Sequence, residues 1–256
     1  MATGERSNGD FCWINVLTPD PVAAQQFFTR LLGWTYVEVP GMGHLIQVDG
    51  HHIGGLWDHA GPDVPPGTPP GIGIMVRVAS ADDTLARVTE LGGTAKPAFD
   101  IAEQGRMAEC LDPVGAGFDL WQGNRSPGMT ADSRRQGVPN WFELISNDPP
   151  RTAAFYTALF GWTTEEMQMP YGTYTTFKLA DRYVGGMFAM TPEMGDMPPH
   201  WGTYFTADDA DATARLAVEL GGEVFMPVME VAGVGRFGGI TSPQGVMFSV
   251  ITEAER

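Results

Sequence analysis

Along the first fifty or so residues, the hydrophobic pattern has first the period of a strand, then that of a helix, and then that of strands again. An apolar run over residues 11–17 has the alternation of a strand, and apolar residues three to four apart over 21–32 mark one helical face. Asp20 and Pro21 supply an N-cap and a first-turn proline, and Gly33 supplies a C-terminal glycine. Three strand-like runs follow, separated by turns that contain glycine. The pattern therefore predicts a βαβββ unit.

The same order restarts after a proline-rich connector at residues 61–70 and is repeated in the second half of the chain, where a second connector spans 190–199. Further helices are predicted at residues 81–91, 149–160 and 209–220. Helices and strands thus occur together in four βαβββ modules, which predicts an α+β fold with mixed sheets.

The four modules form two copies of one design. Residues 13–34 align with residues 141–162 without a gap, 128 positions apart, and weaker matches continue to the end of the chain. A period this long indicates a duplicated domain rather than a solenoid. We expect one domain at 8–124, a polar linker at 125–136 and a second domain at 137–253, each large enough to bury its own core.

Charge narrows the classes of partner. The 256-residue chain has 31 Asp and Glu against 15 Lys and Arg, a formal net charge of −16. It has no stripe of basic residues to meet phosphates, so we expect no nucleic-acid partner. An acidic protein favours cationic small molecules, although a solvated acidic surface explains the charge equally simply.

The apolar segments and cysteines indicate a compartment. No apolar run approaches the roughly 20 residues of a membrane helix, and the polar start does not look like a signal peptide. We therefore expect no membrane partner. Cys12 and Cys110 lie far apart in apolar, strand-like surroundings, which predicts buried thiols rather than a disulfide. Cytoplasmic localisation is the expectation.

The motif D-P-x₅-F-[FY]-x-x-L-[LF]-G-W follows the first strand of each copy, at residues 20–34 and 148–162. It resembles the vicinal oxygen chelate superfamily, which contains glyoxalase I, extradiol dioxygenases, and bleomycin- and fosfomycin-resistance proteins. Two-domain glyoxalase-like proteins of actinobacterial type, often labelled hydroxylases of aromatic-polyketide pathways, look most similar. The resemblance implies two tandem glyoxalase-like domains, each with a U-shaped mixed sheet around a cup.

The resemblance also allows a test for a metal. Metal-using members place His, Gln or Glu on the first and last strands of the two units of a domain, where they converge at the floor of the cup. The mapped positions are Trp13, Gly73 and Asp119 in the first copy and Trp141, Gly202 and Ser249 in the second. Tryptophan and glycine offer no side-chain ligand, and a stable divalent site needs three or more donors. We therefore expect no metal, and no nucleotide or flavin motif indicates another cofactor.

The same positions offer aromatic side chains with a few polar groups, which is how small-molecule sites are usually built. Strand alternation places Trp13 beside Asn15 and Trp141 beside Glu143. Asp119 and Glu143 are candidates to pair with a ligand amine or to act as a general base. The predicted ligand-binding residues are Trp13, Asn15, Trp57, Trp121, Trp141, Trp201 and Ser249.

Structural roles for several of these residues stay open. Trp13 and Trp141 could plug cups that have lost a metal, and Trp57 and Trp201 could belong to the core. Because Ser249 replaces the aspartate, the two cups are expected to differ, with the first as the better site. Arg106 and Arg236 recur at equivalent positions and are expected to pair with carboxylates or cap carbonyls in both copies.

Three functions remain, and we favour the first. It is metal-independent binding of a hydrophobic aromatic small molecule, cationic ones included, in an accessory, self-protection or sequestration role in natural-product metabolism. The alternative is a lyase, isomerase, hydroxylase or dioxygenase-like enzyme with Asp119 or Glu143 as general base. A glyoxalase acting on methylglyoxal is a weaker third reading, because enediolate stabilisation needs a Lewis acid. Each cup is complete within one domain, so a monomer and a homodimer are both open.

Overall fold

The computed structural model describes residues 6–61, 64, 67–169 and 172–254, and it confirms the α+β fold with four βαβββ modules. The N-terminal residues 1–5 and part of the predicted connector at 61–70 lie outside the described residues. In the first domain the elements are β1 (Phe11–Thr18), α1 (Pro21–Leu32), β2 (Thr35–Val39), β3 (Gly43–Val48), β4 (His51–Asp58), β5 (Gly71–Arg77), α2 (Ala81–Glu90), β6 (Thr94–Ala95), β7 (Phe99–Ile101), β8 (Gly105–Leu111) and β9 (Gly117–Gly123).

The second domain repeats this order, with one short 3₁₀ helix in the predicted connector. Its elements are β10 (Pro139–Ser146), α3 (Pro149–Phe160), β11 (Thr163–Met169), β12 (Gly172–Leu179), β13 (Arg182–Ala189), η1 (Pro192–Met194), β14 (His200–Thr206), α4 (Ala210–Glu219), β15 (Glu223–Val231), β16 (Gly235–Thr241) and β17 (Met247–Glu253). The strand-like run at 94–99 of the sequence predicts one strand here, but the structure has two, because Pro97 separates β6 from β7.

Each domain contains one curled mixed sheet. The strand order is β2-β3-β4-β1-β5-β9-β8-β6 in the first, with β7 also on β8, and β11-β12-β13-β10-β14-β17-β16-β15 in the second. The first strands of the two modules pair antiparallel at the centre, as β1 with β5 and β10 with β14. The concave face of each sheet therefore receives side chains from both modules of its domain.

Helix ends follow the predicted chemistry. Asp20 and Asp148 accept hydrogen bonds from backbone N–H groups in the first turns of α1 and α3, at 2.9 and 3.2 Å. Gly33 and Gly161 end these helices at φ values of 72° and 69°, in the left-handed region that glycine adopts without steric cost.

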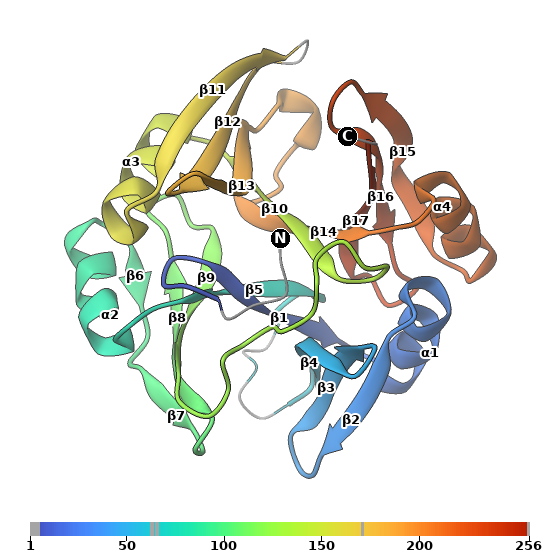
Figure 1. The fold of residues 1–256 in the computed structure, drawn as a ribbon, viewed down its shortest axis with the longest axis horizontal. Coiled ribbons are helices and arrows are strands. Elements are labelled where there is room, and N and C mark those ends of the chain that lie inside the picture. The colour runs from blue at the N-terminus through green and yellow to red at the C-terminus, as the bar shows by residue number, and fades with distance from the viewer. Residues whose placement is uncertain (1–5, 62–63, 65–66, 170–171, 255–256) are drawn as a thin grey trace.

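One hydrophobic core joins the two domains. It contains Ile14 and Val16 of β1 together with residues of both sheets and of the helices α1 to α4. Phe11 stacks on Phe142 of the other domain, with ring centroids 4.2 Å apart. Figure 1 shows α1 beside α4 and α2 beside α3, so each close helix pair contains one helix from each domain. The cups lie on the opposite faces of the sheets, turned away from this core.

Two indole hydrogen bonds cross between the domains at equivalent positions. Trp34 Nε1 donates to the Gly137 carbonyl at 2.7 Å, and Trp162 Nε1 donates to the Gly9 carbonyl at 2.9 Å. Within the described residues, the two copies thus hold each other by a reciprocal pair of bonds.

A third polar contact in the core has no counterpart in the other copy, and it gives a stability prediction. Buried Tyr156 accepts a hydrogen bond from Trp201 Nε1 at 2.9 Å, and its hydroxyl lies near the buried Asp112 carboxyl of the other domain. Tyr156→Phe is expected to lower the free energy of unfolding by about 1–3 kcal/mol, because it leaves the buried Trp201 indole N–H without its acceptor. Urea unfolding measures this. Tyr183→Phe, at a residue that is 45% exposed, should change this free energy by under about 0.5 kcal/mol, and equal losses in the two variants would contradict the role of Tyr156.

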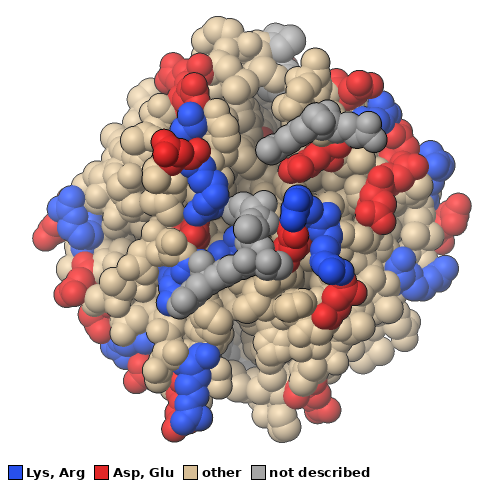
Figure 2. Space-filling model, in the orientation of Figure 1, with Lys and Arg blue, Asp and Glu red and all other residues tan. Residues whose placement is uncertain are grey.

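Surface charge is dispersed on the face shown in Figure 2, where blue Lys and Arg side chains lie beside red Asp and Glu. The prediction for the two repeated arginines is confirmed: Arg106 pairs with Asp82 and Asp100, and Arg236 pairs with Asp211 and Glu230. Cys12 and Cys110 are buried free thiols. Within the described ranges, every helix is too short or too polar to span a bilayer.

Candidate functional site

The first cup has an amide and a carboxylate at its floor. Asn15 on β1 accepts a hydrogen bond from Trp57 Nε1 at 2.9 Å, and its side chain donates one to Asp119 on β9. The register brings these strands together, because Asn15 lies opposite Gly73 on β5 and Met75, two residues later, pairs with Asp119. The structure thus joins three of the predicted site residues in one hydrogen-bonded chain.

Burial gives Asp119 an unusual acidity. Burial and, after it, the Glu109 carboxylate opposite on β8 raise the pKa of this carboxyl to about 7. The hydrogen bond from Asn15 and the charge of Lys96 act in the other direction and favour the ionised form. Asp119 therefore exchanges its proton close to neutral pH, which suits either a counter-ion for a ligand amine or a general base.

Glycines make room for the Trp57 indole. A Cβ atom at Gly43 or at Gly55 would overlap its ring, so the ring lies directly against the backbone of two neighbouring strands. One edge of the indole is fixed by its hydrogen bond to Asn15, as described above. Trp57 is half-buried, which leaves part of its surface for contact with a ligand.

The other two tryptophans of the first cup differ in exposure. Trp121 is 7% exposed and lies in a small buried cluster with Cys12 and Met75, so its ring has little surface left for a ligand. Trp13 packs on this cluster but is only half-buried, and its ring meets His52 edge-on with centroids 6.4 Å apart. Trp13 and Trp57 are therefore the tryptophans that a ligand in this cup can touch.

The second cup is built around Glu143. Its two carboxylate oxygens accept hydrogen bonds from the Tyr174 and Tyr204 hydroxyls at 2.7 and 2.6 Å. Trp141 Nε1 donates to the Tyr174 hydroxyl at 3.0 Å. Burial raises the pKa of Glu143, while the two phenol hydrogen bonds lower it. Tyr174 reaches the carboxylate because Gly186 lies beneath it, where a Cβ would overlap the hydroxyl.

Further aromatic rings extend this cup toward β15 and β16. The ring of Phe237 meets that of Tyr204 at 6.0 Å between centroids, and a Cβ at Gly239 would overlap the ring of Phe225. Ser249, which is buried, hydrogen-bonds the Tyr204 hydroxyl. Phe225 is 49% exposed and forms part of the rim.

Each cup thus has one half-buried acid, but on different strands. In the first cup the amide Asn15 is on the first strand and the acid Asp119 is on the last. In the second cup the acid Glu143 takes the position of Asn15, and Ser249 takes that of Asp119. The expectation that Ser249 makes the second cup a poorer site therefore loses its support, because that cup has its own carboxylate.

The cups also differ at the residues that pair with Asp119 and with Ser249 on the neighbouring strands. Glu109 lies across from Asp119 and forms an ion pair with Lys96, whereas Gly239 lies across from Ser249 and is covered by Phe225. An ion pair in one copy is thus replaced by an aromatic ring over glycine in the other. This makes the second cup the more aromatic and the less charged of the two.

Several cup residues are not predicted from the sequence, and one predicted site residue belongs to the core. Trp201 is 6% exposed and packs in the core against Tyr156, so we remove it from the site. Gly202 and Tyr204 are the residues of β14 that face the cup, a choice set by the register with β10. Alternation from Gly202 could have found Tyr204, but no local pattern shows that Tyr174 reaches Glu143.

Comparison with known proteins places this geometry in a family. A family model described as the Glyoxalase/Bleomycin resistance protein/Dioxygenase superfamily matches residues 138–250. The protein named "Putative glyoxylase CFP32" of Mycobacterium tuberculosis is 38% identical over 249 residues, which cover 94% of each chain. The chain belongs to this superfamily.

Other members of the superfamily resemble the chain over nearly its whole length. Anthracycline biosynthesis protein DauV of Streptomyces sp. (strain C5) is 31% identical over 93% of this chain and 91% of its own. The Mn(II)-bound glyoxalase from Novosphingobium aromaticivorans superimposes with a TM-score of 0.67 at 16% identity, covering 97% of this chain and 84% of that one. A catechol 2,3-dioxygenase gives 0.64 at 13%, with coverages of 98% and 96%. The two structures show the shared fold alone.

One of these structures is described as Mn(II)-bound, so the side chains of both cups are compared with the ligands that a divalent metal needs. Among the described residues, no three His, Cys, Asp or Glu side chains are grouped so that they could hold a metal ion. Near Asp119 lie the Asn15 amide and Glu109, which is paired with Lys96, and the partners of Glu143 are the Tyr174 and Tyr204 phenols. These donors do not fit the three or more convergent N/O ligands of a divalent site.

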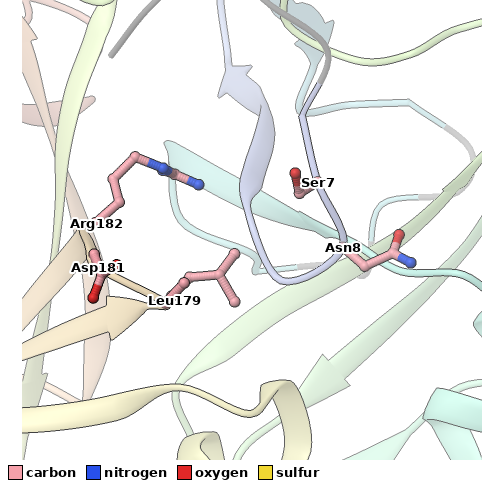
Figure 3. Close-up of a pocket in the computed structure, with 6 residues that line it drawn as sticks. Ser7, Asn8, Leu179, Asp181 and Arg182 are labelled. Carbon is pink, nitrogen blue, oxygen red and sulfur yellow. The ribbon is translucent and has the colours of Figure 1, made fainter.

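One pocket lies outside both cups, at the junction of the domains (Figure 3). It lies between the N-terminal residues Ser7 and Asn8 and the turn from β12 to β13, with Leu179 and Arg182 on the other side. Arg182 forms an ion pair with Asp10 of the first domain. This pocket belongs to the contact between the domains, and none of the cup residues lines it.

Proposed function

We propose that the first cup binds a planar, hydrophobic aromatic small molecule without the help of a metal, in an accessory or self-protection role in natural-product metabolism. The observation that carries the proposal is the arrangement of Trp13 and Trp57, two partly exposed indoles, beside the polar pair Asn15 and Asp119. Indole faces stack on planar rings, and a few fixed polar groups orient a ligand within an apolar pocket.

The relatives support an aromatic ligand. A protein named for anthracycline biosynthesis matches this chain along more than nine-tenths of its length. Ionised Asp119 would in addition favour a ligand that has an amine, by charge pairing in a partly buried site. Anthracyclines and related polyketides combine these two properties, and we propose this chemical class as the ligand.

A second candidate function is supported by the acidity of Asp119. A carboxyl with a pKa of about 7 in a cup is suited to remove a proton from a bound substrate, since general bases work best near the operating pH. In this reading the protein would be an isomerase or lyase acting on the same aromatic ligand, with Asn15 positioning the carboxylate.

Titration with a hydroxyanthraquinone and with an anthracycline separates these readings. We expect saturable quenching of tryptophan fluorescence, with Trp57→Leu weakening the affinity about tenfold, which corresponds to about 1.4 kcal/mol, by removing the stacking surface. Phe188→Leu is the matched control, because Phe188 has the position of Trp57 in the second cup.

The outcomes discriminate between site and chemistry. Equal losses of affinity in the two variants would place the ligand outside the first cup. Absence of quenching at micromolar concentrations of either compound would refute binding of this class. Mass spectrometry of the incubated ligand then tests for turnover: conversion that is lost in Asp119→Asn supports the general-base reading, and an unchanged ligand supports binding alone.

A further inference from the structure

The second cup contains an acid enclosed by aromatic rings. We call Trp141, Tyr174, Tyr204 and Phe237 the aromatic box; Glu143 lies at its base. The four rings come from β10, β12, β14 and β16, so they approach the carboxylate from different strands of the sheet. Such an arrangement places aromatic rings and one carboxylate together in the second cup.

Among the described residues, no cation pairs with the Glu143 carboxylate. Its pKa is raised by burial and lowered by the hydrogen bonds from two phenols. Asp119 in the first cup differs, since Lys96 lies close enough to favour its ionised form. A buried carboxylate without a counter-ion is costly, and phenol hydrogen bonds compensate only part of the cost of removing it from water.

The hydrogen bonds leave Glu143 able to accept more. Each carboxylate oxygen has two acceptor positions, and one phenol hydroxyl occupies one position on each oxygen. Both hydroxyls donate, which orients the carboxylate and maintains negative charge at the base of the aromatic box. The ring faces add a negative electrostatic potential of their own.

We propose that the second cup binds an organic cation, namely a methylated or otherwise alkylated ammonium group, with Glu143 as its counter-ion and the aromatic box around its carbon atoms. An alkylammonium fits better than a metal ion, because phenols, an indole and a phenyl ring supply too few oxygen ligands for a metal. It fits better than a primary ammonium, since weak hydration makes transfer of an alkylated cation onto ring faces less costly.

This inference is separate from the proposed function, because it concerns the other cup and does not require the first cup to bind anything. Its probe is tetramethylammonium chloride, which has no aromatic ring and is not a ligand for stacked indoles. The neutral isostere tert-butyl alcohol and sodium chloride at equal ionic strength are the reference compounds.

The measurement is the chemical shift of the Trp141 indole N–H in ¹⁵N-labelled protein, with the signal assigned by its loss in Trp141→Phe. We expect a saturable shift with tetramethylammonium and none with the alcohol or the salt. Glu143→Gln retains the shape and removes the charge, and we expect it to weaken the affinity about tenfold or more. Glu166→Gln, the same change at an exposed position of β11, should leave the affinity unchanged.

Several results would overturn the inference. Equal shifts with the alcohol and the cation would show that charge is not recognised, and this comparison needs only the unaltered protein. Full affinity in folded Glu143→Gln would show that Glu143 is not the counter-ion of the bound cation. Should circular dichroism show that this variant does not fold, Phe237→Leu replaces it: loss of one ring should weaken binding about two- to fivefold, and an unchanged affinity would contradict the aromatic box.

Discussion

Replacing Phe11 with alanine is expected to lower the free energy of unfolding of the whole chain by about 3–5 kcal/mol, the usual cost of removing a large side chain from a core. Phe11 is 4% exposed and stacks on Phe142 of the second domain. Its ring also meets Trp162 and Trp201, with centroids 5.5 and 5.1 Å away. The cavity left by alanine would therefore be lined mainly by side chains of the other domain.

The location of this cavity has a consequence for cooperativity. Because the core is continuous between the domains, we expect one unfolding transition before and after the substitution, shifted as a whole. Urea unfolding followed by both tryptophan fluorescence and far-ultraviolet circular dichroism tests this. Phe99→Ala, at a 42% exposed phenylalanine of β7, should have a much smaller effect. Two transitions of which only one moves would show that the domains unfold separately.

The second large effect is a dependence of stability on pH. Asp119 has a pKa of about 7 in the folded protein against an ordinary value of 3.8, so the folded state binds this proton more tightly than the unfolded state. Stability is therefore lost as the pH rises from about 4 to about 7 and the carboxyl ionises in its buried position. One pKa unit corresponds to about 1.4 kcal/mol, so the loss is on the order of 4 kcal/mol.

Asp119→Asn removes this ionisation and isolates its effect. We expect the variant to gain stability relative to the wild type as the pH rises from 4.5 to 8, by on the order of 4 kcal/mol at most. Asp112 and Glu143 also have raised pKa values, so the quantity to measure is the difference between variant and wild type at each pH. Asp181→Asn at an exposed turn is the control. A difference that does not change with pH would contradict the raised pKa of Asp119.

The fold could be predicted because local signals agreed with one another. Asp20 and Gly33 mark the ends of α1, and the duplicated motif fixes the order of elements twice. The contents of the cups depended instead on register, since a shift of one residue turns a strand side chain to the opposite face. An irregularity between Phe11 and Trp13, and another between Pro139 and Trp141, set which residues face each cup.

Contacts between residues that are far apart in the sequence could not be predicted from local patterns. Periodicity placed Phe11 and Phe142 on the apolar faces of their strands, but it cannot say that those faces meet across domains. The same limit applies to Tyr174, which is 31 residues from Glu143 and reaches it over the backbone of Gly186. Trp201 was assigned to a cup for a related reason: large aromatic residues suit a core and a binding site alike.

The crossed bonds of Trp34 to Gly137 and of Trp162 to Gly9 give each half of the chain the same donor and the same acceptor. Such a contact is isologous, the kind by which two identical subunits associate about a two-fold axis. The polypeptide thus keeps the interface of a symmetric dimer inside a single chain. Its covalent connection raises the effective concentration of one half at the other. Because identical halves are no longer required, the two cups can have different acids while the crossed indole bonds are the same in both halves.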